Sequence, residues 1–169
     1  SGPVALHPHA GASVVPVTSA CEMRDAVLEH LESSDWIIKA AAVGDYRPAQ
    51  VADDKMKKKN SELSVELVRN PDILSEIGSK KRQNQLVCGF SMETRDLVEN
   101  SRAKLEKKNC DMMVANNLKT AGAGFAHDTN VATLLYRDGS SEPLTLMQKD
   151  DLADLVLDRL LAISRKKEG

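Results

Sequence analysis

The sequence predicts an α/β fold in which helices cover a mainly parallel sheet. First, β-branched or continuous apolar runs alternate along the chain with segments of helical periodicity. Second, two strand-like runs are joined through Asp138-Gly139, which predicts an antiparallel hairpin at one edge of the sheet. Third, a length of 169 residues suffices for one core, so we expect a single domain over residues 1–169.

The first half of the chain is expected to form strand, helix, strand and a long polar arm. Ser19 and Glu22 match a capping box, which predicts a helix that runs to about Leu31. The apolar run 36–43 predicts a strand buried on both faces, and Gly44 ends it. The other expected elements are a strand at 12–17, a polar loop at 45–60 and a half-exposed strand at 63–68, so that an arm occupies about 46–68.

The second half continues the alternation of helices and strands. Asn70 is a good N-cap and Pro71 suits the first helical position, so we expect a helix from there to about Gly78. Thr94 is expected to cap the next helix. Periodicity further predicts strands at 85–91, 111–115, 131–137 and 143–147, and helices at 95–108 and from about 150 onward.

The composition argues against several classes of protein. The net charge is −2, from 23 basic and 25 acidic side chains, and the aromatic residues are one Trp, two Tyr and two Phe. A large nucleic-acid surface needs basic patches and stacking rings. No run approaches the ~20 apolar residues of a membrane span, and three widely spaced cysteines fit neither a zinc site nor a disulfide scaffold. We therefore expect a cytoplasmic protein without nucleic-acid or membrane partners.

Unusual polar residues follow the predicted strands, where an α/β sheet binds its ligands. These segments are 44–47, 90–94, 116–117 and the helix start at Asn70. Residues 55–59 add four lysines. Such a run is commonly a solvated, self-repelling stretch, and alternatively it neutralises a polyphosphate.

A helical wheel places two lysines of the 95–108 helix on its inner face. At ~100° per residue, Lys104 and Lys108 fall on the same side as Leu105. Their stems could simply run along apolar surface to water. Two lysines four residues apart repel each other, however, so this placement favours an anion between them.

Two carboxylates are candidate ligands of a divalent cation. Asp45 follows a buried strand, and Asp72 lies in the first turn expected after Asn70, where free N–H groups could face a phosphate. As a plain helix start, this second segment needs no function. No dinucleotide or phosphate-binding Gly-rich loop follows a strand, and the four histidines are scattered. The pattern favours metal-assisted nucleotide chemistry over a hydrolytic triad, with no catalytic histidine and no zinc.

Taken in order, several short blocks resemble the phosphopantothenoylcysteine synthetase family, a ligase domain often fused in bacteria to a flavin-dependent decarboxylase. The blocks are 40–48, 55–58, 70–74, Gly89-Phe90 with Glu93-Thr94, Lys104 with Lys108, Asn116-Asn117, and Gly124-Phe125 with Asp128 and Asn130. Each block is weak alone, but the ordered set covers most of the chain and is specific. The resemblance implies a Rossmann-like three-layer sandwich, and FMN would belong only to a fused decarboxylase.

The resemblance also implies a reaction and its residues. In the family, the carboxylate of 4'-phosphopantothenate attacks the α-phosphate of CTP, and the amine of cysteine then displaces CMP from the acyl-cytidylate. Lys55 would be the catalytic residue facing the triphosphate, and Mg²⁺ would bridge the phosphates to Asp45 or Asp72. The implied nucleotide-binding set is Lys39, Ala40, Ala41, Asp45, Lys55, Asn70, Pro71, Asp72, Ile73, Phe90, Lys104 and Lys108. A second copy of the chain would be a partner, through the arm at 46–68.

One departure from the family pattern leaves alternatives open. The family begins with a β-α unit that holds a Gly-rich turn and an Asn-x-Ser-Ser-Gly type segment, and this chain starts after it, at Ser1. We therefore expect N-terminal truncation relative to the family and do not predict full turnover from the chain alone. One alternative is a non-catalytic nucleotide-binding or dimerisation module derived from this fold. Another is a different Rossmann-like transferase, which the missing dinucleotide fingerprint disfavours.

Overall fold

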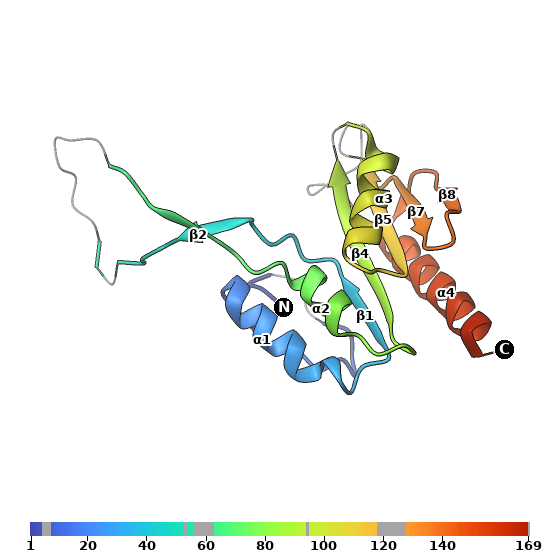
Figure 1. Cartoon of the computed structure of the whole chain (residues 1–169), viewed down its shortest axis with the longest axis horizontal. Helices are drawn as coiled ribbons and strands as arrows, with labels where there is room; N and C mark the ends of the chain where they lie inside the picture. The colour runs from blue at the N-terminus through green and yellow to red at the C-terminus, as the bar shows by residue number, and fades with distance from the viewer. Residues whose placement is uncertain (5–7, 53, 56–62, 94, 118–127, 169) are drawn as a thin grey trace. The chain divides into compact units, whose positions relative to one another are not determined.

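The computed structural model describes every residue of the chain except 5–7, 53, 56–62, 94, 118–127 and 169 (Figure 1). The chain forms two compact units. The first, which we call the ribbon unit, comprises Ser1–Val27 and Ala42–Asp72. The second, the sheet unit, comprises Leu28–Ala41 and Ile73–Gly169.

The sheet unit is built on a five-stranded sheet in the order β1-β4-β5-β7-β8. Strands β1 (Trp36–Lys39), β4 (Leu86–Glu93) and β5 (Met112–Asn117) are parallel. Strands β7 (Ala132–Tyr136) and β8 (Ser141–Pro143) continue the sheet as an antiparallel hairpin. The predicted fold class is therefore confirmed: this is a Rossmann-like α/β fold with a mainly parallel sheet and an antiparallel hairpin at one edge.

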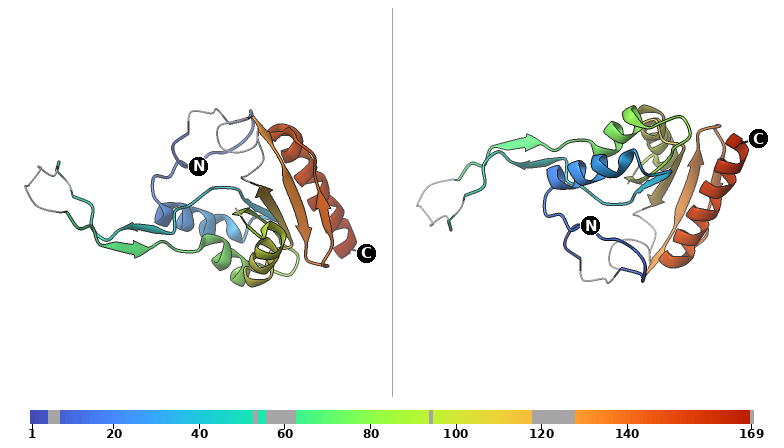
Figure 2. Two further views of the ribbon diagram at one scale, coloured as in Figure 1. Left: turned by 90° about the horizontal axis from the view of Figure 1, so that it is seen from above. Right: turned by 90° about the horizontal axis from the view of Figure 1, so that it is seen from below.

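Helices cover both faces of this sheet (Figure 2). On one face, α4 (Lys149–Glu168) packs Leu152, Val156 and Leu160 against the core. Full burial of a leucine or valine side chain contributes roughly 1.5–3 kcal/mol to the stability of the fold. On the other face, α2 (Ile73–Lys80) and α3 (Leu97–Lys107) lie against β4 and β5. Successive strand residues point to opposite faces, so the continuous apolar run of β4 supplies both contacts.

Two glycines allow α2 to approach its neighbours closely. A Cβ at Gly89 in β4 would lie 2.6 Å from Cδ2 of Leu74 in α2. A Cβ at Gly78 in α2 would overlap the carbonyl oxygen of Lys108, at the end of α3. Nearby, Asn109 Nδ2 donates a hydrogen bond of 2.6 Å to the Gly78 carbonyl. The C-terminal ends of α2 and α3 are therefore joined through backbone atoms that only glycine leaves accessible.

Helix α1 (Ala20–Leu31) begins at the predicted capping box. The Glu22 N–H donates to Ser19 Oγ at 3.2 Å, and the Thr18 N–H donates to Glu22 Oε2 at 2.8 Å. These bonds satisfy donors that a helix start otherwise leaves without partners. The hydrogen bonds from Thr18, followed by that from Ser19, lower the pKa of the Glu22 carboxyl. The prediction of this helix is confirmed.

The ribbon unit contains a two-stranded antiparallel ribbon, β2 (Tyr46–Pro48) with β3 (Leu67–Arg69). The Ala49 N–H donates to the Glu66 carbonyl at 2.9 Å, which extends the pairing by one bond at one end. The strand predicted at 63–68 is therefore shorter than expected and shifted toward Arg69. The pairing is local, and most residues on both strands are exposed.

Other predicted boundaries were wrong for identifiable reasons. Residues 12–17 form no strand: Pro16 lacks an N–H, and the Val17 N–H bonds the Ser1 carbonyl at 2.9 Å. Strand β1 ends at Lys39, four residues before the predicted end. Helix α3 starts at Leu97 because Asp96, with φ 47°, is in the left-handed region that a helix cannot include. Thr94, its predicted cap, lies outside the described residues.

Two further elements differ from prediction near the hairpin and before α2. The strand predicted at 143–147 is replaced by β8 and by β9 (Met147–Gln148), which pairs with β6 (Thr129–Asn130). Helix α2 starts at Ile73 instead of Pro71. None of the helices in the described part of the chain has the length and apolarity to cross a bilayer.

Candidate functional site

The carboxyl ends of β1, β4 and β5 lie at one edge of the sheet unit, because these strands are adjacent and parallel. Lys39, the last residue of β1, pairs with Gly89, and Phe90 follows in β4. Glu93 and Asn117 form the last pair between β4 and β5. Open α/β sheets bind their ligands beyond this edge. Two predicted nucleotide residues, Lys39 and Phe90, are thus placed at or near the expected edge.

The Lys39 side chain folds back on the segment that follows its strand. Its Nζ donates a hydrogen bond of 2.7 Å to the Ala41 carbonyl. Ala40 and Ala41 are exposed. This hydrogen bond holds the segment after β1 in a defined conformation and occupies the Ala41 carbonyl.

Lys104 reaches the same edge from α3. Its Nζ lies 2.6 Å from Glu93 Oε1, and its side chain is 45% exposed. The helical wheel correctly predicts the inner face of α3, since Ser101 and Leu105 are buried. The anion beside Lys104 in this structure is a carboxylate of the chain itself. An ammonium group carries three donors, so Lys104 keeps capacity for a second anion while it is paired with Glu93.

A buried hydroxyl pair fixes α3 on β4 one turn before Lys104. Ser91 Oγ donates to Ser101 Oγ at 2.6 Å, and the two residues are 4% and 0% exposed. A buried hydroxyl without a partner costs about 1–3 kcal/mol, so the two serines must stay together. This bond sets the register of α3 along β4 and, with it, the place of Lys104.

Lys108 lies at the C-cap of α3 and is half-buried. Its N–H donates to the Lys104 carbonyl at 3.0 Å. Its carbonyl packs against Gly78. Its backbone thus ties α3 to α2, and its positive charge acts on the nearby Cys110 thiol.

The remaining predicted residues belong to the ribbon unit, apart from Ile73, which is buried in α2 of the sheet unit. Asp45 and Asn70 lie at the base of the ribbon, where the Asn70 N–H donates to the Asp45 carbonyl at 2.8 Å. Asn70 Nδ2 also donates to the Gly44 carbonyl at 2.8 Å. The predicted N-cap role of Asn70 is therefore wrong, because its amide closes the ribbon and the helix starts three residues later.

Lys55, Pro71 and Asp72 complete the predicted set in the ribbon unit. Lys55 and Asp72 are exposed, and Pro71 is half-buried. Lys57, Lys58 and Lys59 lie outside the described residues. The structure thus divides the predicted set between the units. The sheet unit holds Lys39, Ala40, Ala41, Ile73, Phe90, Lys104 and Lys108, and the ribbon unit holds Asp45, Lys55, Asn70, Pro71 and Asp72.

The carboxylates predicted to bind Mg²⁺ fit an ion that arrives with a nucleotide. In the described part of the chain, no group of three or more His, Cys, Asp or Glu side chains could hold a metal ion by itself. Asp45 and Asp72 are exposed, and the Asn70 N–H bond ties Asp45 to the segment that precedes Asp72. Mg²⁺ in nucleotide sites keeps several waters and takes one or two carboxylates beside the phosphates. Asp45 and Asp72 therefore stay candidate ligands for an ion of this kind.

The cysteines take no part in these groupings. Cys88 and Cys110 are buried and Cys21 is half-exposed, and none is in a disulfide. Burial raises the pKa of the Cys88 thiol, and mainly burial raises that of Cys110 to about 11. Protonated, buried thiols are poor nucleophiles. Cys88 and Cys110 therefore act as buried structural residues.

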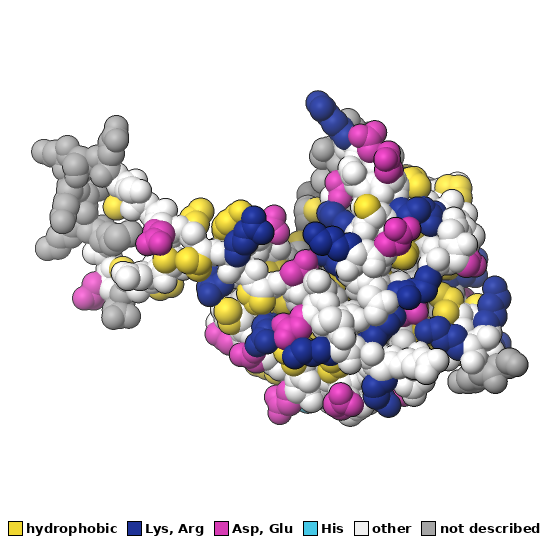
Figure 3. All heavy atoms as spheres, viewed as in Figure 1, with side chains coloured by type: hydrophobic (Ala, Val, Ile, Leu, Met, Phe, Trp, Pro, Cys, Tyr) yellow, Lys and Arg dark blue, Asp and Glu magenta, His cyan; other side chains and the backbone are white. Residues whose placement is uncertain are grey.

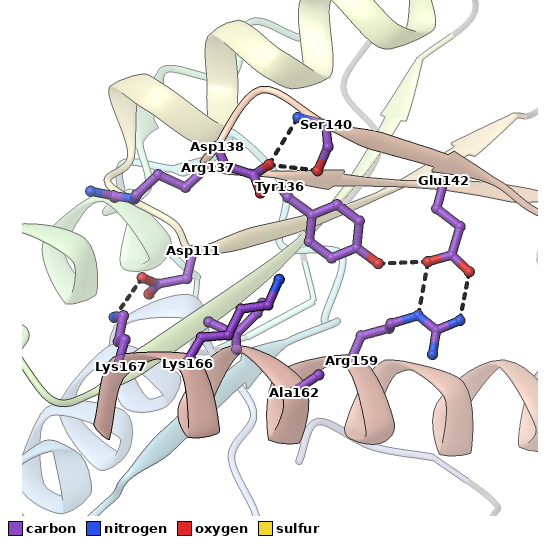
Figure 4. A pocket seen from close by; sticks show the side chains of 11 residues that line it. Asp111, Tyr136, Arg137, Asp138, Ser140, Glu142, Arg159, Ala162, Lys166 and Lys167 are labelled. Atoms are coloured by element: carbon purple, nitrogen blue, oxygen red, sulfur yellow. Dashed lines mark hydrogen bonds and ion pairs between the residues drawn. The ribbon is translucent and has the colours of Figure 1, made fainter. Parts of the chain in front are cut away.

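A concave region lies between the β7–β8 hairpin and α4, with a volume of about 500 Å³ (Figure 4). Glu142 accepts hydrogen bonds from Arg159 Nε at 2.8 Å, Arg159 Nη2 at 2.7 Å and the Tyr136 hydroxyl at 2.7 Å. Asp111 accepts from Lys81 at 2.6 Å, Lys167 at 3.0 Å and the Val87 N–H at 2.9 Å. The carboxylates of Glu142 and Asp111 are thus neutralised by neighbouring basic side chains, as expected of a stabilising network.

Electrostatics explain why these carboxylates stay ionised. Burial disfavours the charge of Asp111, but the hydrogen bonds from Lys81, Val87 and Lys167 outweigh it and lower its pKa. The Arg159 and Tyr136 bonds lower the pKa of Glu142 to about 2. Sequence reasoning missed these residues because they meet only through tertiary packing. The sequence around a charged residue near a hairpin does not indicate which distant residue it will pair with.

Arg47 is another residue that sequence reasoning did not assign to the site. Its Nη1 donates to the Arg69 carbonyl at 2.8 Å and to Asn70 Oδ1 at 3.1 Å. The signal that could have indicated it is its place in the block 40–48, directly after Asp45 and Tyr46. Its partners are 22 and 23 residues away, so the contact depends on the ribbon register.

Comparison with known proteins gives a consistent set of relatives. The coenzyme A biosynthesis bifunctional protein CoaBC of Bacillus subtilis is 44% identical over 167 residues, which are 98% of this chain and 41% of that protein. The chain therefore spans about two fifths of the length of this curated relative. The crystal structure of the C-terminal domain of CoaBC matches with a TM-score of 0.78 and 35% identity, over 99% of this chain and 72% of that one.

A more distant structure shares the fold alone. The Cab2 mutant H337A in complex with phosphopantothenate-cysteine has a TM-score of 0.68 and 16% identity, over 90% of this chain and 52% of that one. The family model described as the DNA/pantothenate metabolism flavoprotein C-terminal domain matches residues 1–163. The order of sequence blocks, the parallel sheet and this match over nearly the whole length agree: the chain belongs to the family of DNA/pantothenate metabolism flavoprotein C-terminal domains.

Proposed function

We propose that this chain is a phosphopantothenate–cysteine ligase domain that uses CTP in coenzyme A biosynthesis. The observation that carries the proposal is the 44% identity to CoaBC over 98% of the chain. The proposed nucleotide edge is supported by Lys39 and Phe90, which lie in the parallel strands β1 and β4, and by Lys104 of α3, which pairs with Glu93 at the end of β4. The ligand named for the Cab2 structure supports the same class of product.

The proposed chemistry has two steps. A carboxylate oxygen of 4'-phosphopantothenate forms a bond to the α-phosphorus of CTP while the bond to the pyrophosphate oxygen breaks. The cysteine amine then forms a bond to the acyl carbon, CMP leaves, and the nitrogen loses a proton. Negative charge shifts onto the departing phosphates in the first step, so positive charge near them lowers the barrier.

In this proposal the chain's own residues bind and orient the nucleotide. Lys55 faces the triphosphate as a point charge, and Lys104 and Lys108 bind its phosphates or base. The backbone of 39–41, Asp45, Phe90 and the segment 70–73 line the pocket. Asp45 or Asp72 would hold Mg²⁺, which would neutralise phosphate charge when bound.

We also propose that two copies associate through the arm at 46–68. Val51 is 84% exposed, Leu63 71% and Leu67 56%, which places large apolar side chains in water along the ribbon (Figure 3). Several large apolar side chains exposed on one segment are typical of association sites. The alternative function is a non-catalytic nucleotide-binding or dimerisation module, which would keep the nucleotide pocket or this dimer surface without turnover.

Nucleotide binding tests the assignment of the site. CTP with Mg²⁺ is titrated calorimetrically into the chain and into the Lys104→Ala and Lys55→Ala variants. We expect each substitution to weaken binding at least tenfold, since each removes a charge-assisted contact. Lys107→Ala is the matched control, because Lys107 is exposed on the same helix. Equal affinity of all four proteins would refute the site.

Pyrophosphate release separates the ligase from the non-catalytic module. It is measured with CTP, 4'-phosphopantothenate and cysteine, for this chain and for a protein that adds the family's β-α unit before Ser1. The ligase proposal expects release by the extended protein that depends on 4'-phosphopantothenate. CTP binding without any release by the extended protein would favour the module.

A further inference from the structure

A closed set of hydrogen bonds lies at the base of the ribbon, where β2 and β3 run together (Figure 1). Arg47 Nη1 donates to the Arg69 carbonyl at 2.8 Å and to Asn70 Oδ1 at 3.1 Å. Asn70 Nδ2 donates to the Gly44 carbonyl at 2.8 Å. The Asn70 N–H donates to the Asp45 carbonyl at 2.8 Å. All five residues belong to the ribbon unit.

Arg47 determines which way the Asn70 amide faces. A guanidinium group only donates hydrogen bonds, so the amide atom next to it must be the oxygen. The amide nitrogen then points toward Gly44, whose carbonyl only accepts. If the amide were reversed, two donors would face each other at Arg47 and two acceptors at Gly44. The arginine therefore selects the single orientation in which Asn70 bridges the two strands.

The bridge joins two segments that the proposed function assigns to the nucleotide. Asp45 directly follows Gly44, and Pro71 and Asp72 directly follow Asn70. Three of the four bonds connect residues 44–47 to residue 70. Segments that are held in the binding conformation before the ligand arrives lose less entropy when it binds. Arg47, Asp45 and Gly44 are exposed, so the fold does not need this cluster for its core.

We infer that Arg47 is a positioning residue for nucleotide binding, acting through Asn70 on the segments 44–46 and 70–72. This inference rests on the proposed function of those segments. Lysine is a poor substitute, because both bonds come from Nη1 and the lysine ammonium ends one bond short of that position. The ammonium is also more strongly hydrated than a guanidinium. Loss of the bridge leaves the charge of the site unchanged but lets the two segments move.

Two charge-conserving substitutions test the inference. Arg47→Lys removes the Nη1 donor and keeps the charge, and Arg69→Lys is its matched control on the opposite strand. The Arg69 guanidinium lies 5.8 Å from the centre of the Tyr46 ring and takes no part in the bridge. With CTP and Mg²⁺ in a calorimeter, we expect Arg47→Lys to raise the dissociation constant about tenfold, the size of one lost charged hydrogen bond. Arg69→Lys is expected to bind like the unmodified chain. Equal affinity of the two variants would overturn the inference.

A double-mutant cycle separates positioning from direct contact. If Arg47 acts through Asn70, Arg47→Lys has no further effect on affinity in the Asn70→Ala background. If the guanidinium touches the nucleotide itself, the loss is the same in both backgrounds, and the positioning role is wrong. Unfolding by urea checks that both variants keep the stability of the unmodified chain.

Hydrogen exchange distinguishes failure of the inference from failure of the proposed function. The Asn70 amide proton is measured by nuclear magnetic resonance without any nucleotide. We expect it to exchange at least threefold faster in Arg47→Lys than in Arg69→Lys, because the bridge protects it. Unchanged exchange overturns the bridge whatever the ligand. Absence of CTP binding by the unmodified chain, together with the faster exchange, would refute the proposed function and keep the bridge.

Discussion

Glu142 shows how a single side chain can join three elements. It lies in β8, and it accepts hydrogen bonds from Arg159 in α4 and from Tyr136 in β7. These bonds lower its pKa from 4.5 to about 2. The pKa is lower in the folded chain than in the unfolded chain, so the unfolded chain binds the proton first on acidification. The stabilisation is therefore complete above about pH 4.5 and is lost as the pH falls toward 2.

Glu142→Gln should lower the free energy of unfolding at pH 7 by about 1 kcal/mol. Solvent screening limits the effect, because the carboxylate is 33% exposed. The difference in the free energy of unfolding between the variant and the unmodified chain should shrink between pH 4.5 and pH 2.5. Over this range the Glu142 carboxylate of the unmodified chain loses its stabilising effect. Urea denaturation at several pH values measures this difference. A difference that stays constant over this range would contradict the assigned pKa, and Glu106→Gln on the exposed face of α3 serves as control.

At the scale of elements, Gly78 decides how closely α2 and α3 approach. In an isolated helix, Gly→Ala stabilises by up to about 1 kcal/mol through helix propensity. Here a Cβ would overlap the Lys108 carbonyl, and the backbone cannot move aside as a flexible side chain would. The steric effect is larger than the propensity effect, so the two helices must separate.

Gly78→Ala should therefore destabilise the chain by about 3 kcal/mol. The measurement is urea or thermal unfolding followed by circular dichroism. Ser79→Ala is the control, since Ser79 is exposed in the same helix and is expected to change stability by less than about 0.5 kcal/mol. A stabilised Gly78→Ala variant would show that α2 and α3 are not packed as described.

Elements could be predicted from the sequence where their determinants are local. The capping box of α1 lies within four residues, and the apolar runs of β4 and β5 are continuous, so both were predicted correctly. Asn70 was misread as a helix cap because its real partners, Gly44 and Arg47, are 26 and 23 residues away. The start of α3 was missed because the left-handed backbone of Asp96 has no clear sequence signature.

The candidate site could also be predicted only where its determinants are local. Its edge could be predicted, because the carboxyl ends of parallel strands meet at one side of the sheet. The pairing of Lys104 with Glu93 could not, because it depends on the register that Ser91 and Ser101 impose on α3. The assignment of individual residues to nucleotide and Mg²⁺ stays a prediction.

At the scale of the whole molecule, the exposed apolar residues of the arm at 46–68 predict self-association. Val65→Glu with Leu67→Glu should convert a dimer into a monomer without lowering the unfolding temperature, because both side chains are more than half exposed. Light scattering after size-exclusion chromatography measures the mass. Leu146→Glu, 53% exposed in the sheet unit, is the matched control and should leave the mass unchanged. A dimer that survives the double substitution would rule out the ribbon as its interface.

The hairpin that ends the five-stranded sheet has a consequence for how the molecule avoids aggregation. Strand β8 is only three residues long, its last residue is Pro143, and Glu142 stands in its middle. A short outer strand with a proline and a charge is a poor template for an incoming strand, since one backbone donor is missing and a carboxylate must be displaced. The β8 side of the sheet therefore disfavours growth into a neighbouring chain.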